Sequence, residues 1–366
     1  MKKPVPFLDL SQFPADLKSA LKKKFAEMLD LGIYAGGQEL ALLESKLKDL
    51  TGSKEAIPCS NGTDALEIAL KMLGIGPGDD VMLPTLTWVS TAEAIRMVGA
   101  NPVFVDTDAQ GLIDLRLLEK NLTPATKAVI PVHLYGRMVD MLRLCRFAKE
   151  KGIAVVEDAA QALGAKQDGK SAGTWGDIGC LSFYPTKNLG ALGEAGALLT
   201  QNAKLGKTMK HFVNHGQIEK GNHAILGKNA RMDSIQAGFL NLKLQHFQQW
   251  QIKRKAIAKI YLEAFNGLDL LLPRDILDDH HNAHLFVVQT EEREKLIQIL
   301  ERYRVGSAIH YPSVLPRMKP FYVSKKFPVS EMLTKKILSL PLNAWMSRGD
   351  IEIVVAAVKK FYSKTS

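Results

Sequence analysis

A single lysine occupies an unusual position in the stretch SFYPTKNLG (182–190), where an apolar strand is followed by a proline and then a glycine. An amine near the end of a buried strand loses its hydration. Lys187 must therefore either extend toward water or take part in chemistry. Desolvation lowers the pKa of a lysine from its ordinary value of about 10.4, which would free the amine to react.

Three other segments carry residue types that could serve the same chemistry. Asp158 ends the run VVED at the point where open α/β sheets bind ligands, although a helix N-cap would use the same residue. CSNGTDAL opens a helix with small residues, including Gly62 and Thr63. Their backbone amides could bind an anion, or a side chain could cap them as at an ordinary helix N-terminus. Trp88 follows another strand and could pack in the core or stack on a planar ring.

Together these features match the needs of one cofactor. Pyridoxal phosphate requires a lysine for its Schiff base, an acid on its pyridine nitrogen, donors for its phosphate and a flat neighbour for its ring. An aspartate beside the ring nitrogen favours the protonated form, which makes the ring an electron sink. The sequence therefore predicts a pyridoxal phosphate site built from Lys187, Asp158, the helix-opening loop and Trp88.

The elements that must position these residues alternate along the first half of the chain. Two amphipathic helices, each stopped by glycine, come first, in 14–32 and 37–52. Short apolar runs separated by helical stretches then predict βαβ units and a mostly parallel sheet with helices on both faces. The predicted strands are 56–59, 81–83, 103–105, 128–132 and 153–156, and the predicted helices include 63–73, 89–98 and 141–151.

The pattern changes after residue 161. A hairpin turn at Asp168-Gly169 precedes two strands, DIGCLSFYP and GALLT, and a helix near 203–213. A long helical region from Ser234 to about Phe265 then suggests a connector between domains. We expect a large cofactor-binding domain in residues 1–240, and the connecting helix with a small domain in 241–366.

The small domain is expected to begin with a βαβ-like arrangement. Its parts are the strand HLFVVQT, the helix EEREKLIQILERY and the strand VGSAIHYP. Two helices, near 331–338 and 351–361, are expected to close the chain.

Composition narrows the classes of protein. No apolar run among the 366 residues approaches the roughly 20 needed to cross a bilayer. The start MKKPVPFLDL lacks the apolar region of a signal peptide, so we expect a cytoplasmic protein. The net charge of +10 fits solvated helix faces. No helix-turn-helix, zinc-finger or RNP signature indicates nucleic acid, whereas a nucleotide diphosphate would suit a positive field.

Two motifs invite other functions but do not fit them. GALGEAG (190–196) lacks glycines that a dinucleotide fingerprint requires and precedes a strand instead of opening a helix. DDHHNAH (278–284) places three histidines where a loop enters a strand, and nothing nearby completes a metal shell. The three cysteines are far apart in the sequence and form no CxxC pair, so we expect no disulfide framework and no metal.

The ordered motifs now resemble one family over nearly the whole chain. They are CSNGTDAL, GIGPGDDVMLPTLTWVSTAEAI, PVFVD, IPVHLYGRMVDM, VVEDAAQALGA, SFYPTKNLGALGEAGALLT, GKNARMDSIQAGFL and IHYP. Together they resemble the DegT/DnrJ/EryC1/StrS family of sugar aminotransferases. This resemblance implies the α/β fold type I of pyridoxal phosphate enzymes, in which a large domain with a mostly parallel sheet flanked by helices is joined to a smaller C-terminal α/β domain. Glu194 and Ala195 depart from the GDGGA that many relatives carry.

The resemblance also implies roles for individual residues. The cofactor contacts are Lys187 as Schiff-base lysine and proton shuttle, Asp158 on the pyridine nitrogen, Gln161 on the ring hydroxyl, Gly62, Thr63 and Ser182 on the phosphate, Trp88 on the ring, and Asn229 on the phosphate of the neighbouring subunit's cofactor. The active enzyme would then be a homodimer with shared sites. Arg231 is the candidate for the carboxylate of the amino donor, usually L-glutamate in this family.

The implied reaction is transfer of an amino group to a keto-sugar attached to a nucleotide. Tyr184 stands where relatives that aminate C-4 tend to carry histidine, so the chain resembles relatives that act at C-3, often on thymidine-diphosphate-linked 3-keto-6-deoxyhexoses. His310 and Tyr311 are expected to line the same sugar pocket. The alternatives are C-4 amination, a non-enzymatic cofactor-binding regulator, and a lyase or decarboxylase of the same fold.

Overall fold

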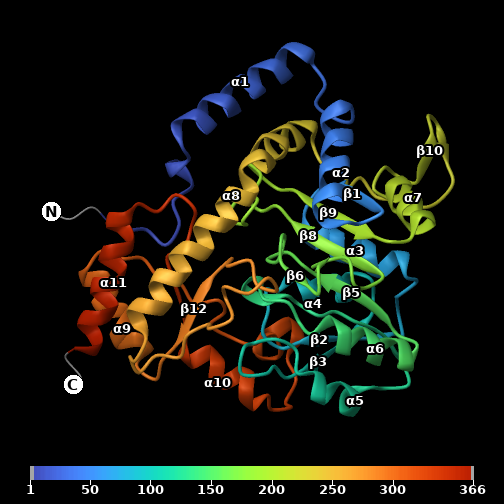
Figure 1. Ribbon diagram of the computed structural model, residues 1–366. Helices are drawn as coiled ribbons and strands as arrows, with labels where there is room; N and C mark the ends of the chain where they lie inside the picture. Colours follow the sequence, from blue (N-terminus) through green and yellow to red (C-terminus); the bar gives the residue numbers. More distant parts are fainter. Residues whose placement is uncertain (1–3, 364–366) are drawn as a thin grey trace.

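The computed structural model describes residues 4–363 and is organised around a seven-stranded sheet (Figure 1). The strands lie in the order β1-β9-β8-β5-β4-β2-β3. Their bounds are β1 (Glu55–Cys59), β2 (Asp80–Pro84), β3 (Asn101–Val105), β4 (Thr126–Val129), β5 (Ala154–Asp158), β8 (Ile178–Ser182) and β9 (Gly196–Thr200). Strands β3, β2, β4, β5 and β8 run parallel, and β9 runs antiparallel to both β8 and β1. The predicted fold class, a mostly parallel sheet within an α/β protein, is confirmed.

Helices cover both faces of this sheet. One face packs on α3 (Gly62–Met72), α4 (Ser90–Met97) and α7 (Ala203–Phe212), and the other on α2 (Gln38–Thr51), α6 (Met141–Lys151) and the first part of α8 (Ser234–Phe265). Because successive side chains of a strand point to opposite faces, neighbouring residues enter different cores. Val155 joins the core beneath α6, and Val156 joins the core beneath α3 and α4.

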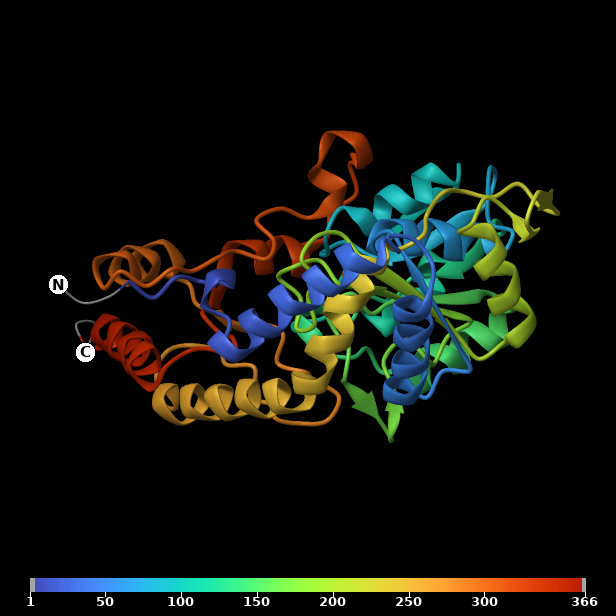
Figure 2. The same ribbon diagram turned by 90° about the horizontal axis from the view of Figure 1, so that it is seen from above.

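Helix α8 connects the sheet to a smaller C-terminal part (Figure 2). Beyond the sheet, α8 packs with β12 (Phe286–Gln289), α9 (Arg293–Arg302), β13 (Ile337–Leu340) and α11 (Arg348–Tyr362) around a core of their own. The N-terminal segment contributes to this core through Val5, whose amide bonds to the Arg304 carbonyl. Helix α1 (Ala15–Leu31) lies along α8, α5 (Leu118–Asn121) follows β3, and α10 (Pro328–Lys336) precedes β13.

The expected βαβ-like start of the small domain is wrong. Strand β12 pairs antiparallel with β13, whereas the segment 305–312 makes two isolated bridges, from Val305 to Val5 and from Ala308 to Ser339. The helix expected over 331–338 ends at Lys336, and the next residues form β13. The reason is burial: every residue of ILSL (337–340) is buried, whereas much of 305–312 is partly exposed, so the apolar run takes the place beside β12.

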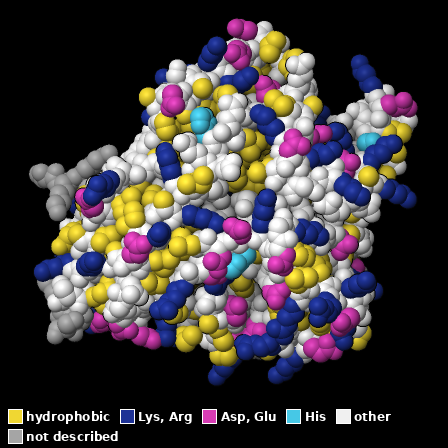
Figure 3. All heavy atoms as spheres, viewed as in Figure 1, with side chains coloured by type: hydrophobic (Ala, Val, Ile, Leu, Met, Phe, Trp, Pro, Cys, Tyr) yellow, Lys and Arg dark blue, Asp and Glu magenta, His cyan; other side chains and the backbone are white. Residues whose placement is uncertain are grey.

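Two hairpins extend from the main sheet. The predicted turn joins β6 (Lys166–Gln167) to β7 (Lys170–Ser171), and Asp168 and Gly169 both adopt positive φ, as a tight two-residue hairpin turn requires. The second hairpin, β10 (Gln217–Glu219) with β11 (Asn222–His223), was not predicted. Between residues 4 and 363 we find no helix with the length and apolar character needed to cross a bilayer. The face in Figure 3 intersperses basic and acidic side chains over most of its area.

Candidate functional site

The carboxyl ends of β1 and β8 meet at one edge of the sheet. Cys59 and Ser182 both pair opposite Gly196, so these two strands end at the same level. The turn after β1 therefore lies directly against the end of β8. A Cβ atom added to Gly62 would lie 2.8 Å from the Ser182 Cβ, which explains why only glycine fits there. The structure thus brings together the residues predicted to hold a phosphate.

The N-terminus of α3 presents free donors at this point. Asn61 caps the helix, accepting a hydrogen bond from the Asp64 amide at 2.8 Å. In the part of the chain that the structure describes, the amides of Gly62 and Thr63 have no acceptor, while the Thr63 hydroxyl donates to Ser90 Oγ at 2.7 Å. Unpaired amides at a helix N-terminus attract an anion. This cradle therefore fits a phosphate group, as the sequence predicted.

Asp158 is the last residue of β5 and is buried beside the same edge. Its carboxylate accepts hydrogen bonds from the Thr91 hydroxyl at 2.9 Å and from the Ala160 amide at 3.2 Å. Burial raises the pKa of this carboxyl, and the two hydrogen bonds and the nearby Lys187 amine oppose that rise. A buried acid with so few donors is suited to a cationic partner such as a protonated ring nitrogen.

Lys187 lies in the loop between β8 and β9, where its amide donates to the Tyr184 carbonyl at 2.8 Å. Its side chain keeps part of its surface exposed, yet enough protein surrounds the amine for desolvation to lower its pKa to about 8. The Asp158 carboxylate is near enough to oppose this shift. The lysine and the aspartate predicted from the sequence are therefore electrostatic neighbours, and an amine of this pKa exchanges protons readily near neutral pH.

An aromatic wall, formed by Trp88 and Tyr311, lies near Asp158. Trp88 is 58% exposed, so it is not the core residue that its type alone would suggest, and its ring centroid lies 5.7 Å from that of Tyr311. The buried Gln161 joins this wall to the sheet. Its amide nitrogen donates to the Tyr311 hydroxyl at 3.1 Å, and its oxygen accepts from the Tyr135 amide at 2.6 Å. A planar ring could stack on the exposed indole.

The predicted substrate residues divide into two groups. His310 and Tyr311 lie inside the site. Burial lowers the pKa of His310 to about 4, and the charge of Lys187 lowers it further. The His310 ring also forms a hydrogen bond with Ser339 Oγ at 2.9 Å. Tyr184 lies at the rim, 47% exposed.

Asn229 and Arg231 lie beside the end of β1, where the Arg231 guanidinium donates to Asn229 Oδ1 at 3.2 Å. Within one chain, no polar contact joins either of them to Lys187 or Asp158 in the described range 4–363.

Several residues of the site escaped prediction. Thr91 holds Asp158, and Tyr135 donates from its hydroxyl to the His310 carbonyl. His284 bonds through Nδ1 to Asn188 Oδ1 at 2.9 Å, and burial together with the charge of Lys187 lowers its pKa well below the usual range. Thr91 could have been found, because it opens a helix that follows a strand ending at the same edge. The others depend on packing between distant segments.

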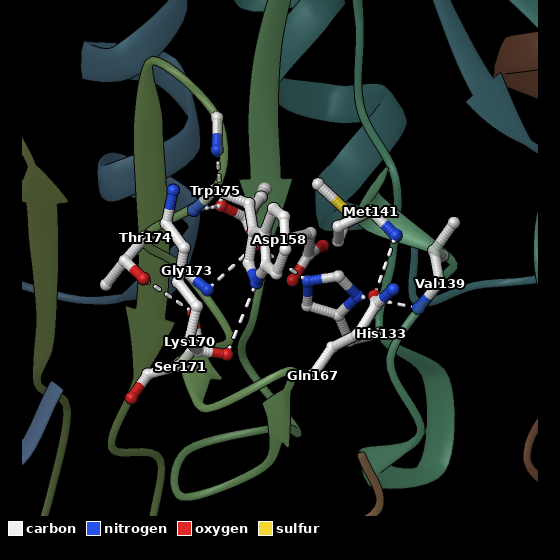
Figure 4. Close-up of polar contacts among 12 residues, drawn as sticks. His133, Val139, Met141, Asp158, Gln167, Lys170, Ser171, Gly173, Thr174 and Trp175 are labelled. Atoms are coloured by element: carbon white, nitrogen blue, oxygen red, sulfur yellow. Dashed lines mark hydrogen bonds and ion pairs between the residues drawn. The ribbon is translucent and has the colours of Figure 1, made fainter. Parts of the chain in front are cut away.

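A second buried polar cluster is centred on Glu157, the residue before Asp158 on β5 (Figure 4). His133 accepts from the Val139 amide at Nδ1, so its Nε2 carries the proton and donates to Glu157 Oε2 at 2.9 Å. Glu157 also accepts hydrogen bonds from three amides of the loop after β7, those of Gly173, Trp175 and Gly176. The fully buried carboxylate is thereby satisfied by four donors.

The histidine tract 278–284 packs between the main sheet and the smaller C-terminal part. His280 bonds to Asp275 Oδ2 at 2.9 Å, while His281 and His284 are buried. Burial lowers the pKa of His281 to about 3. In the described residues, no group of three or more His, Cys, Asp or Glu side chains is placed to hold a metal ion.

The assembled edge fits the cofactor that the sequence predicted. The phosphate cradle at Gly62, the amine of Lys187, the incompletely bonded carboxylate of Asp158 and the exposed indole of Trp88 all lie at the carboxyl ends of neighbouring strands. This is the edge where open α/β sheets bind ligands.

Comparison with known proteins identifies the family of this chain. The profile of the DegT/DnrJ/EryC1/StrS aminotransferase family matches residues 15–359. A relative from Acidithiobacillus ferrooxidans, UDP-N-acetyl-3-dehydro-alpha-D-glucosamine 3-aminotransferase, is 37% identical over 97% of both chains.

Two solved structures are similar over almost the whole chain. The DesV structure from S. venezuelae, in complex with a ketimine intermediate, superposes with a TM-score of 0.95 at 35% identity over 99% of both chains. NtdA from Bacillus subtilis, with bound cofactor PMP, superposes with a TM-score of 0.93 at 30% identity, over 99% of this chain and 86% of NtdA. The chain therefore belongs to the DegT/DnrJ/EryC1/StrS aminotransferase family, as its motifs predicted.

Proposed function

We propose that this aminotransferase transfers the amino group of L-glutamate to a keto-sugar carried on a nucleotide. The observation that carries the proposal is the Lys187 amine beside the buried Asp158 carboxylate, at the edge that also holds the phosphate cradle. The nucleotide-sugar substrate named for the relative from A. ferrooxidans supports the substrate class.

The cofactor is pyridoxal 5'-phosphate, with pyridoxamine 5'-phosphate as its aminated form; the PMP-bound NtdA supports this assignment. When bound, it supplies the electron sink that labilises a proton on the carbon bearing nitrogen. In this chain the amides of Gly62 and Thr63 and the Ser182 hydroxyl would hold its phosphate. Asp158 would bind the ring nitrogen, Trp88 would cover the ring, and Gln161 would bond to its hydroxyl.

Lys187 would both bind the cofactor and move protons. A pKa of about 8 leaves a sizeable fraction of the amine neutral near pH 7.5, which is the form that attacks a carbonyl and accepts a proton. The neutral His284 and His310 nearby add no competing positive charge. Arg231 would bind the carboxylate of the donor.

The carbon that receives nitrogen is proposed to be C-3. Tyr184 lies exposed at the rim of the site, where its phenol can contact a sugar, and His310 and Tyr311 face the site from the smaller part of the molecule. The 3-aminotransferase from A. ferrooxidans supports the same position. A modest difference in contacts is enough to decide between C-3 and C-4.

The complete site is proposed to form in a cytoplasmic homodimer. Asn229 is exposed, two residues before the Arg231 that bridges to the end of β1, and is expected to reach the phosphate of the neighbouring subunit's cofactor. Each chain is proposed to divide into a cofactor-binding domain, residues 1–240, and a connecting helix with a small domain, 241–366.

The function is tested by adding L-glutamate to the purified protein loaded with pyridoxal phosphate. An absorbance shift to that of pyridoxamine phosphate, followed by amination of a keto-sugar nucleotide seen by mass, is the expected result. No shift would favour a cofactor-binding regulator or a lyase. NMR of the product locates the nitrogen: amination at C-4 with no turnover of 3-keto substrates would reject the C-3 proposal.

The role of Lys187 has its own test. Lys187→Ala should remove covalent cofactor binding and turnover while the fold is kept. Borohydride reduction of the wild-type protein and peptide mapping should label Lys187, and a label on another lysine would contradict the assignment. Lys253→Ala, an exposed lysine on α8, is the matched control.

A further inference from the structure

Helix α8 makes three polar contacts with the loop that carries Lys187. Gln236 Oε1 accepts from the Leu192 amide at 2.9 Å, the Lys243 ammonium donates to the Gly190 carbonyl at 2.6 Å, and Gln251 Oε1 accepts from Asn188 Nδ2 at 3.0 Å. These three helix positions are seven and eight residues apart, so they lie along one side of α8.

The central contact uses a lysine that is almost completely buried. Lys243 is 1% exposed, and its ammonium lies 4.5 Å from the centroid of the Phe13 ring. The Gly190 carbonyl is its one hydrogen-bond acceptor within residues 4–363, and no carboxylate pairs with it there. Desolvation lowers its pKa to about 8. A buried cation without a counterion is costly, so a leucine or methionine would serve mere packing better.

The carbonyl that Lys243 holds belongs to a tightly closed loop. A Cβ added to Gly190 would lie 2.3 Å from the Pro185 carbonyl oxygen, so the loop returns closely onto itself. The Ala191 amide also donates to the Phe183 carbonyl at 2.7 Å. Fixing the Gly190 carbonyl therefore fixes the backbone from which the Lys187 side chain projects.

The same helix reaches the smaller part of the molecule. Arg254, buried eleven residues after Lys243 and on the same side of α8, donates to the carbonyls of His284 at 3.2 Å and Leu342 at 2.9 Å. The His284 ring in turn holds Asn188, the residue after Lys187. The part of the loop that follows Lys187, residues 188–192, is thus tied to α8, and α8 is tied to the smaller part.

We propose that Lys243 is a positioning residue for Lys187: from α8 it holds the Gly190 carbonyl and so sets how the Lys187 amine meets its reaction partner. The proposal rests on the proposed catalytic role of Lys187. It assigns a function to a buried lysine that is not among the residues proposed to hold the cofactor or the substrate. It also makes the placement of the amine depend on the helix that joins the two parts of the chain.

The experiment compares Lys243→Met with Lys243→Arg and with the exposed control Lys253→Met. The first measurement is amide hydrogen exchange in the cofactor-free protein, which does not depend on activity. Lys243→Met should raise exchange in peptides covering 187–192 by about tenfold, while peptides from β4 and β5 stay unchanged. The pH dependence of Lys187 acylation, read by peptide mapping, should shift in the same variant.

The second measurement is steady-state kinetics of the cofactor-loaded enzyme. Lys243→Met should lower kcat about tenfold with little change in KM, and Lys243→Arg should recover part of the loss. Unchanged exchange and an unchanged Lys187 pH profile in Lys243→Met would overturn the proposal. If Lys243→Met does not fold, Lys243→Leu is measured instead, and unchanged exchange there is equally decisive. If the wild-type enzyme shows no aminotransferase activity, the proposed function is refuted. The hydrogen-exchange comparison still tests whether Lys243 holds the loop.

Discussion

Two carboxylates follow one another on β5 and have opposite surroundings. Glu157 points to the face of the sheet beneath α6, where His133 and three backbone amides satisfy it completely. Asp158 points to the face beneath α4 and receives two hydrogen bonds, from Thr91 and Ala160. Both are buried. One carboxylate is fully used by the protein, and the other retains acceptor capacity for something else.

This difference distinguishes a buried carboxylate that stabilises the fold from one that is available to a ligand. A buried carboxylate whose acceptor capacity is filled holds together the segments that supply its donors. Here these segments are the loop 173–176 and the segment after β4 that carries His133. A buried charge left short of donors raises the energy of the empty site, which a cationic ligand can relieve. Three experiments can test this interpretation.

The largest effect is expected from removing the fully bonded carboxylate. Glu157→Ala would leave His133 Nε2 and three amides buried without an acceptor, and we expect a loss of about 3–5 kcal/mol in the free energy of unfolding. Chemical denaturation measures this loss. A cost below about 1 kcal/mol would show that water or other groups replace Glu157 easily.

Asp158→Asn should produce the contrasting phenotype. Folding should be nearly unaffected, because an amide oxygen can still accept from Thr91, while turnover falls by about 10²- to 10³-fold through loss of the negative charge. Steady-state kinetics and thermal unfolding of the same preparation give both values. Thr91→Val, which keeps the shape but removes one donor, should lower turnover by about tenfold. Near-normal turnover in Asp158→Asn would make this residue a simple helix cap.

The pH dependence of stability gives the third and smallest effect. In the cofactor-free protein the pKa of Lys187 is lowered to about 8, so folding disfavours its charged form. This penalty is fully present below pH 8 and disappears as pH rises toward the unfolded value near 10.5.

Lys187→Met should therefore stabilise the cofactor-free chain at pH 7 by up to about 3 kcal/mol, at roughly 1.4 kcal/mol per pKa unit. The gain should vanish by about pH 10.5, and Lys253→Met should show none. Urea unfolding at several pH values provides the measurement. Equal stability of wild type and Lys187→Met at pH 7 would mean that the empty site carries no such strain.

Much of the sheet and of its active edge could be predicted from the sequence. Strands β1 to β5 and helices α3, α6 and α8 follow directly from periodicity and caps, since local sequence determines both. Lys187, Asp158, Trp88 and Gly62 could be proposed for the site because each stands at the carboxyl end of a strand or shortly after it.

The rest depends on contacts between distant segments, which periodicity does not encode. The predicted helix 331–338 takes in the first two residues of β13, because the pairing of β13 with β12 joins residues about 50 positions apart. The roles of His133 and Glu157 were missed for a similar reason, since their donors come from loops on either side of β5. Lys243 resembled one more basic residue on a helix, and only its burial distinguishes it.

The position of α8 late in the chain has a consequence for synthesis of the protein. Every strand of the main sheet and Lys187 itself emerge from the ribosome before any of the helix residues that hold the lysine loop. Gln251 follows Lys187 by about 60 residues, or roughly 3–12 s at ordinary elongation rates of about 5–20 residues per second. During that interval the nascent sheet carries Lys187 on a loop without these three contacts, which can form only after α8 has been made.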